Sequence, residues 1–225
     1  MAKQLIQPQI PSLISVLDGE SRPDIPYYIA TMISNTFRKK VLLIDNSEHA
    51  MLYNAIPDSH TGEIKKDGML YVMAAVAYSP DFMRRFDTCI CYHGTYASSL
   101  LWDKSDIHLV LTGYQPDAFE RFRYEANNPI ASLDLEKDFV FFLDHVTNKV
   151  NAENILKKEK LLTSDKSIPY VELPIDETDR ICMLSLLYNG YQDAKATGKE
   201  LYSAITGLIS VITKVPLAQL KKIRR

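Results

Sequence analysis

LISVLDGESRPD at residues 13–24, followed by an apolar segment at 25–37 and VLLID at 41–45, is the stretch that decides the fold. An apolar run, a short polar loop, a helix-length apolar segment and a second apolar run predict a strand, a loop, a helix and a parallel strand. The alternation continues to the end of the chain. Further strands are predicted at 70–73, 88–92, 107–112, 139–143 and 170–173, the last of them peripheral.

FVFFL at 139–143 is the most hydrophobic of these runs, as expected of a strand covered on both faces. Helices are predicted between the strands, among them 50–56, 98–103, 116–127, 151–160 and 178–187, and a long helix at 199–213. We therefore predict a single α/β domain over residues 1–225: a three-layer sandwich with a mostly parallel sheet and helices on both faces.

Composition narrows the class of protein. The 225 residues are 46% hydrophobic and 24% charged, which is ordinary for a soluble globular protein, and the net charge of -2 gives no general attraction to nucleic acid. No apolar run approaches the roughly 18 residues of a membrane span, and the start MAKQLIQP lacks the apolar core of a signal peptide. The sequence therefore predicts a cytoplasmic protein.

The three cysteines do not form a disulfide pattern. Cys89 and Cys91 alternate along a predicted strand, so their side chains share one face. Without a nearby pair of histidines, Cys-x-Cys is a weak metal-ligand set, and we expect these thiols to be small buried hydrophobes.

The loop at residues 18–24 stands where many nucleotide-binding proteins hold phosphate with backbone N–H groups at a helix N-terminus. Here the loop has one glycine, Gly19, and Pro23 removes one N–H donor. Asp18, Glu20 and Asp24 place carboxylates where a triphosphate would sit. Like charges a few Å apart repel by several kcal/mol at an effective dielectric of about 20, so the loop is poorly suited to phosphate.

The order of landmarks resembles the MinD/ParA group of deviant P-loop (SIMIBI) ATPases. KVLLID at 40–45 is similar to the family's second strand, and FDTCIC at 86–91 is similar to its Phe-Asp-Tyr segment before the Walker B aspartate. SDIHLVLT at 105–112 resembles its Ala-Asp-apolar-Val-Thr segment. LPID at 173–176, followed by YNG at 188–190, resembles its late Ile-Pro-Tyr-Asp and Asn-x-Gly stretch. The resemblance implies a P-loop NTPase-like fold.

The same resemblance places the family's chemical positions on other residue types. Arg22 is the only cation where the P-loop lysine falls, Ser47 replaces the water-activating aspartate, Tyr92 the Walker B aspartate, and Asp144 the base-reading asparagine, while Asp45 is kept. The remnant site predicted in this way comprises Gly19, Glu20, Ser21, Arg22 and Asp24 of the loop and the strand-end residues Asp45, Ser47, Tyr92 and Asp144.

These losses indicate a pseudo-ATPase: a non-catalytic scaffold or positioning protein that holds no cofactor and no metal and acts through protein–protein contacts, with a homodimer as one form. Two alternatives stay open. One is an active ATPase with an atypical Walker A loop, which binds ATP with Arg22 in place of the lysine and Asp45 as an acid. The other is a DNA partition module that binds through the basic helix at 151–160, although the near-neutral charge makes nucleic acid a less expected partner.

Two further groups of side chains are candidates for a site at the edge of the predicted sheet where the parallel strands end. A His/Asp/Glu set at the strand ends suits either acid–base or metal chemistry, or is a row of polar groups facing solvent: Asp45, Glu48, His49, Tyr92 and His93. A set of aromatic residues is expected around the vacated nucleotide site, where it would fill space or bind a partner: Tyr27, Tyr28, Tyr92, Tyr96 and Trp102.

Residues 214–225 form a basic tail with apolar positions. Its candidate membrane or partner residues are Leu217, Leu220, Lys221, Lys222, Ile223, Arg224 and Arg225. One interpretation is an amphipathic helix that binds an anionic bilayer peripherally, at the inner membrane surface. The other is a helix that packs on the core and has a solvated basic end.

Overall fold

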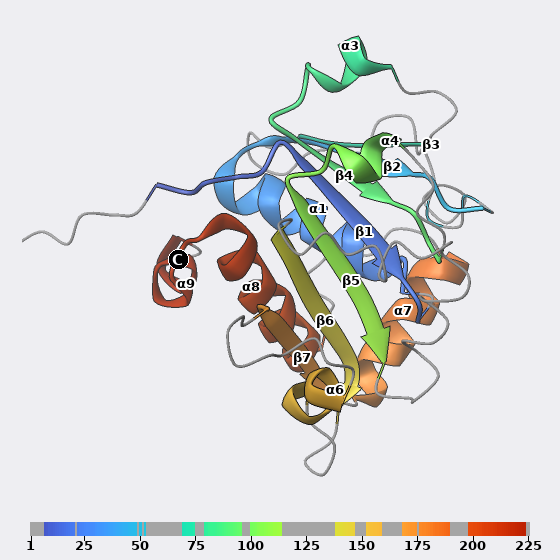
Figure 1. The fold of residues 1–225 in the computed structure, drawn as a ribbon, viewed down its shortest axis with the longest axis vertical. Coiled ribbons are helices and arrows are strands. Elements are labelled where there is room, and N and C mark those ends of the chain that lie inside the picture. Colours follow the sequence, from blue (N-terminus) through green and yellow to red (C-terminus); the bar gives the residue numbers. More distant parts are fainter. Residues whose placement is uncertain are drawn as a thin grey trace, which may run out of the picture.

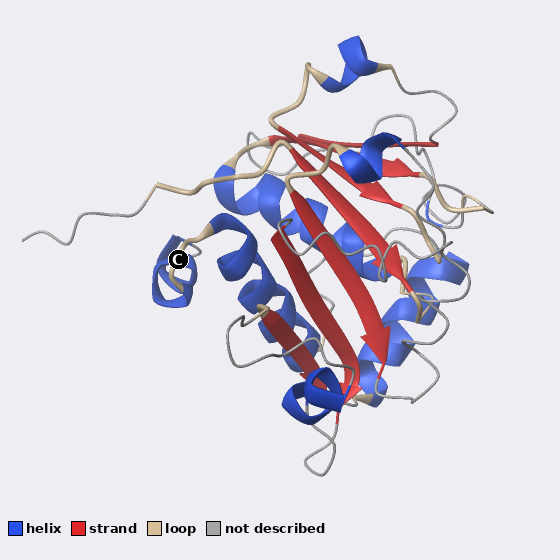
Figure 2. Cartoon of the chain, viewed as in Figure 1, coloured by secondary structure: helices blue, strands red, loops and turns tan. Residues whose placement is uncertain are grey.

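The computed structural model describes residues 7–20, 22–48, 50, 52, 69–74, 79–95, 100–113, 138–146, 152–158, 168–174, 176–189 and 198–223. Its centre is a seven-stranded sheet of order β3-β2-β4-β1-β5-β6-β7, and every neighbouring pair is parallel (Figures 1 and 2). The predicted α/β class with helices on both faces of a parallel sheet is confirmed.

The strands are β1 (Leu13–Asp18), β2 (Lys40–Asp45), β3 (Met69–Ala74), β4 (Thr88–Tyr92), β5 (Ile107–Gly113), β6 (Asp138–Val146) and β7 (Tyr170–Pro174). The described helices are α1 (Asp24–Phe37), α3 (Pro80–Met83), α4 (Leu100–Asp103), α6 (Ala152–Lys158), α7 (Glu177–Asn189), α8 (Lys199–Thr213) and α9 (Leu217–Ile223). Of the helices predicted at 50–56 and 116–127, the second lies outside the described residues, as does nearly all of the first.

The strand positions follow the apolar runs of the sequence, but strand neighbours do not follow chain order. β4 lies between β1 and β2, so the first strand–helix–strand unit spans a gap that a later strand fills. β6 runs to Val146, three residues beyond the predicted end, because it pairs with β5 as far as Asp144 and with β7 as far as Val146. β7 is an edge strand, as predicted.

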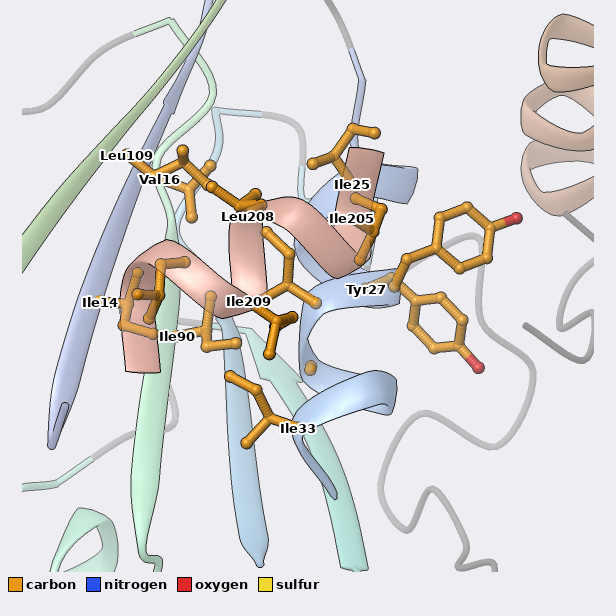
Figure 3. Close-up of a cluster of buried hydrophobic side chains, with 14 of the residues drawn as sticks. Ile14, Val16, Ile25, Tyr27, Ile33, Ile90, Leu109, Ile205, Leu208 and Ile209 are labelled. Carbon is orange, nitrogen blue, oxygen red and sulfur yellow. The ribbon is translucent and has the colours of Figure 1, made fainter. Parts of the chain in front are cut away.

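Alternation along the strands divides the core into two faces. Ile14 and Val16 of β1 face α1 and α8, and Figure 3 shows Leu208 and Ile209 of α8 over this side of the sheet. The opposite face holds the second apolar cluster, which includes Leu42, Cys89, Cys91 and Leu101.

The cysteines behave as predicted. Cys89 and Cys91 are buried free thiols on one face, and burial raises the pKa of Cys89 to about 12. Burial likewise raises the pKa of Cys91 above its ordinary range, so neither thiol is a ready thiolate.

The parallel strands end at one edge of the sheet, where α1 begins at Asp24 directly after the loop that follows β1. Figure 1 shows α7 lying beside this carboxyl edge, close to the arrowheads of β1 and β5. In open α/β sheets ligands bind at the carboxyl ends of strands, so this edge positions the candidate site.

The C-terminal tail is partly built into the core. Val215 and Leu220 are buried and belong to the main apolar cluster, while Leu217 is 39% exposed and Lys221 and Lys222 are exposed. The side chain of Ile223 and residues 224–225 lie outside the described part, so the predicted membrane contact through this tail stays a prediction. Within the described ranges, no helix combines the length and apolar character that crossing a bilayer requires.

Candidate functional site

Alternation along the strands brings the predicted strand-end residues to one side of the sheet. Val16, Ile90 and Phe142 belong to the apolar cluster on the face of the sheet that α1 and α8 cover. Asp18, Tyr92 and Asp144 each come two residues later in the same strand and so point to that face. Asp18, Tyr92 and Asp144 are all nearly fully buried. The carboxyl edge therefore presents two carboxylates and a phenol to the N-terminus of α1.

Asp18 is the hydrogen-bond acceptor at the centre of the loop. Its carboxylate accepts from the backbone N–H of Glu20 at 2.8 Å, the backbone N–H of Arg22 at 2.5 Å and the hydroxyl of Tyr92 at 2.9 Å. Burial raises the pKa of Asp18 to about 6, and the three donors hold it down against that effect. At neutral pH the ionised form therefore predominates, satisfied by the loop's own donors.

The Arg22 guanidinium is held by two carboxylates. Nε donates to Asp24 Oδ1 at 2.9 Å and Nη2 to Asp24 Oδ2 at 2.8 Å, a bidentate pair, while Nη1 donates to Asp144 Oδ2 at 2.5 Å. Arg22 is 4% exposed. Burial opposes its charge, but the two carboxylates outweigh this and raise the pKa of Arg22 above its ordinary value. The cation is thus fully charged and turned inward.

The N–H group of Gly19 is also engaged within the protein. Gly19 donates to the carbonyl of Leu111 at 3.0 Å, and Pro23 has no N–H to offer. The carboxyl group of Glu20 lies over Gly113, where an added Cβ would come within 2.7 Å of it. Ser21 lies outside the described residues. An anion entering this loop would have to displace Asp18 from its donors and compete with Asp24 and Asp144 for Arg22.

The structure thus joins four of the nine residues of the predicted remnant site into one network, to which Asp18 also belongs: Arg22, Asp24, Tyr92 and Asp144. Ser47 and Asp45 form a separate local turn beside it: Asp45 Oδ1 accepts from the backbone N–H of Ser47 at 3.0 Å and from its hydroxyl at 2.5 Å. Asp45 stands opposite Tyr92 in the β2–β4 register.

His93 does not join an acid–base set with Asp45, which corrects that alternative. It follows Tyr92 and so lies on the other face, where Nε2 is 3.0 Å from Ser15 Oγ and Nδ1 is 3.1 Å from Asn46 Nδ2. Burial, and secondarily the charge of His108, lowers the pKa of His93 to about 3, so the ring is neutral. His49 lies outside the described residues.

The direction of hydrogen bonding shows that His93 does not activate Ser15. Ser105 donates its hydroxyl to the carbonyl of Leu101 at 2.8 Å, so it accepts from Ser15 Oγ at 2.6 Å. Ser15 has then used its one proton, and His93 Nε2–H donates to it while Nδ1 accepts from Asn46. A nucleophilic serine would need the opposite polarity, so this is a closed structural chain.

The predicted aromatic group is divided between the two faces. Tyr27 and Tyr28 make an edge-to-face contact with centroids 5.8 Å apart on the α1 side, the side of Tyr92. Trp102 packs instead on the opposite face, against His93 and His108 at 5.7 and 4.5 Å, so its predicted place at the vacated site is wrong. Tyr96 lies outside the described residues. Within the described ranges, no group of three His, Cys, Asp or Glu side chains is placed to hold a metal ion.

Sequence reasoning missed Asp179 in the first turn of α7. Asp179 is 3% exposed, and neither carboxylate oxygen has a hydrogen-bond partner. Burial and then the charge of Asp176 raise the pKa of Asp179 to about 6. The available signal was spacing: Asp179 precedes the buried Cys182 and Met183 by three and four residues, which puts it on the inward face of the helix.

Comparison with known proteins gives a match in structure only. No family model and no curated protein matches the sequence. A ParA family ATPase from Chlorobium tepidum TLS superposes with a TM-score of 0.58 at 14% identity, over 89% of this chain and 98% of that one. MinD in the MinC:MinD cell division complex of Aquifex aeolicus gives 0.58 at 11% identity, over 95% and 96%.

A putative plasmid partition protein from Borrelia burgdorferi bound to AMPPNP gives a TM-score of 0.54 at 13% identity, over 95% of this chain and 98% of that one. The match extends over nearly the whole length of each neighbour, and the sheet described above is the one expected from the resemblance. At these identities the likeness concerns architecture and not activity. The chain has the fold of the MinD/ParA-type P-loop ATPases.

Proposed function

We propose that this protein is a non-catalytic MinD/ParA-like scaffold or positioning protein, in which an internal ion-pair network occupies the nucleotide site. One observation carries the proposal: the carboxylate of Asp18 accepts the N–H groups of Glu20 and Arg22, the donors that a phosphate would need in the loop before α1. The only described cation of the loop, Arg22, is bound by Asp24 and Asp144.

The electrostatics of the loop support the same proposal. A triphosphate would meet Asp18, Asp24 and Asp144, all nearly fully buried, and the one guanidinium of the loop is already shared between Asp24 and Asp144. At an effective dielectric of about 20, each added unit charge about 4 Å from a carboxylate is opposed by about 4 kcal/mol. Breaking the Arg22 pairs to release the cation adds a further cost, because both partners are buried.

Isothermal titration with Mg-ATP and with Mg-ADP tests the proposal. We expect no binding heat at about 1 mM nucleotide. Saturable binding in the micromolar range would overturn the proposal and favour the active-ATPase alternative, in which Arg22 leaves Asp24 and Asp144 to meet phosphate. In that case Arg22→Lys should also bind nucleotide, because lysine likewise binds phosphate as a point charge.

Protein contacts are then the route of action, as in the complex of MinD with MinC among the structural neighbours. A homodimer that forms without nucleotide is the simplest such contact. Size-exclusion chromatography with light scattering over a concentration series tests it, and a strict monomer at high concentration would exclude the homodimer version. The DNA-partition alternative gains no support from α6, since Lys157 there is paired with Glu153 at 2.5 Å.

A further inference from the structure

Two carboxylates converge beside the ion-pair network, at the start of α8. A Cβ added at Gly198 would overlap Asp179 Oδ1 and would lie 3.3 Å from Asp176 Oδ2. The two carboxyl groups therefore approach the same point, and the glycine leaves the space that they occupy. Asp176 comes from the connection between β7 and α7 and is partly exposed, whereas Asp179 is 3% exposed.

Four described groups have the leading electrostatic effects on Asp179, and three of them are acidic. Asp176, Asp144 and Asp24 are carboxylates, and Arg22 is the one cation among the four. The hydrogen bonds of that guanidinium go to Asp24 and Asp144. A buried carboxylate without a hydrogen bond costs free energy, and native proteins normally supply a donor or a counter-ion at such a position.

We propose that Asp176 and Asp179 form a subsite for one organic cationic group, a guanidinium or an ammonium, which enters past Asp176. The proposal deepens the proposed function and rests on it in one respect, because it gives the protein partner a chemistry: a segment that offers an arginine or lysine side chain. Two carboxylates on one side of a planar guanidinium provide the acceptors that its parallel N–H groups require.

A metal ion fits this place less well than an organic cation. Calcium takes six to eight oxygen ligands and magnesium requires an octahedral shell, and the described residues offer no third acidic or imidazole ligand placed with this pair. A proton is the competitor, since one carboxyl group in its neutral form would also relieve the repulsion. The raised pKa of Asp179, about 6, predicts that the proton displaces the cation in mildly acidic solution.

The test is an NMR titration of the full chain with ethylguanidinium chloride, followed at the amide of Gly198 and of the first turn of α7, with sodium chloride replaced to keep ionic strength constant. We expect saturable shifts at about pH 8 that weaken at least tenfold below about pH 5. Asp179→Asn and Asp176→Asn should each weaken binding at least tenfold. Asp81→Asn, which removes the same charge from an exposed position on α3, should leave it unchanged.

A second arm separates the two sources of the cation. An acetylated, amidated pentapeptide with one central arginine is compared with its citrulline counterpart, which has the same shape without the charge. Binding of the arginine peptide alone assigns the subsite to a partner polypeptide, and binding of ethylguanidinium without the peptide assigns it to a small cation. No saturable shift with either probe, or equal affinity in Asp179→Asn, would overturn the subsite.

The outcome is independent of the nucleotide titration. A protein that binds neither probe and no nucleotide would lose the subsite and keep the proposed function, whereas one that binds Mg-ATP would lose the proposed function whatever the cations do. Asp179→Asn should fold, because it replaces a buried carboxylate that lacks a partner with a neutral group of the same shape. Asp176→Asn, at a partly exposed position, provides the second variant for the same question.

Discussion

Arg22→Met is the substitution that most directly tests whether the loop is held by its internal ion pairs. The side chain of Arg22 is 5% exposed, and those of its partners Asp24 and Asp144 are 0% and 2% exposed. Methionine keeps an unbranched apolar stem but leaves two buried carboxylates without their cation. Removing one partner of a buried ion pair costs about 3–5 kcal/mol, and we expect a loss in this range at neutral pH.

Urea unfolding followed by the fluorescence of Trp102, the only tryptophan, and by circular dichroism measures this loss. The matched control is Lys39→Met, because Lys39 and Asp87 form an exposed pair at 3.3 Å with side chains about 40% exposed. We expect that control to cost less than about 1 kcal/mol. Adding Asp24→Asn and Asp144→Asn to Arg22→Met should recover most of the lost stability, since the stranded charges are then gone.

An unchanged or increased stability of Arg22→Met would refute this reasoning. It would mean that the guanidinium is free to leave its carboxylates, as a residue kept for phosphate would be. That result would favour the active-ATPase alternative without any measurement of nucleotide binding.

Three further predictions concern the loop, the opposite face of the sheet and the C-terminal helix in turn. Tyr92→Phe removes a donor to Asp18, so unfolding experiments should show a loss of about 1–3 kcal/mol above pH 6, where that carboxyl is ionised, and a smaller loss at about pH 4. The pKa of His93 is about 3 in the folded protein and 6.5 in the unfolded chain, so the protein loses stability as the pH falls from 6.5 toward 3 and the unfolded chain takes up the proton. His93→Gln should therefore remove about 2–3 kcal/mol of the stability difference between pH 6.5 and about 4.5. Leu220→Ala should cost about 2–4 kcal/mol and Leu217→Ala less than about 1, because the first is 4% and the second 39% exposed; equal losses would contradict the packing of α9.

The placement of the tail also decides how membrane binding should be tested. Removing residues 214–225 would take Val215 and Leu220 out of the core, so a loss of liposome binding after truncation would not distinguish a membrane contact from unfolding. Leu217→Ser and the charge reversal Lys221→Glu change exposed positions only. Equal, negligible co-sedimentation of wild type and these variants with anionic vesicles would retire the membrane interpretation.

The fold was predictable from sequence because strands buried on both faces require continuous apolar runs, and segments 13–17, 41–45, 107–112 and 139–143 are such runs. The order of the strands was harder to predict, because no local sequence pattern indicates that β4 lies between β1 and β2. The position of Asp45, Tyr92 and Asp144 near strand ends follows from the apolar runs that precede them, and parallel strands end at the same edge.

The connections of those residues needed coordinates. Arg22 and Asp144 are 122 positions apart in the sequence. They come into contact because β1, β5 and β6 are adjacent strands of the sheet. His93 is separated from Asp45 because Asp45 stands opposite Tyr92 and adjacent residues of a strand point to opposite faces of the sheet. The burial of Asp179 was not predictable from its position alone, because an acid in the first turn of a helix is ordinarily solvated and interacts favourably with the helix dipole.

The changes in the loop depend on one another, which a residue-by-residue comparison would not reveal. The loop before α1 still presents N–H donors that favour an anion, and the chain provides that anion itself in Asp18. With a buried carboxylate there, an acid at position 92 would add a second negative charge, whereas Tyr92 adds a donor. Arg22 in turn requires acceptors, and the carboxylate of Asp144 accepts a hydrogen bond and carries a negative charge, whereas an amide oxygen would only accept the bond. Reverting any one of these residues toward an ATPase pattern therefore leaves a charge or a donor without its partner, so a return to phosphate binding would require several substitutions together.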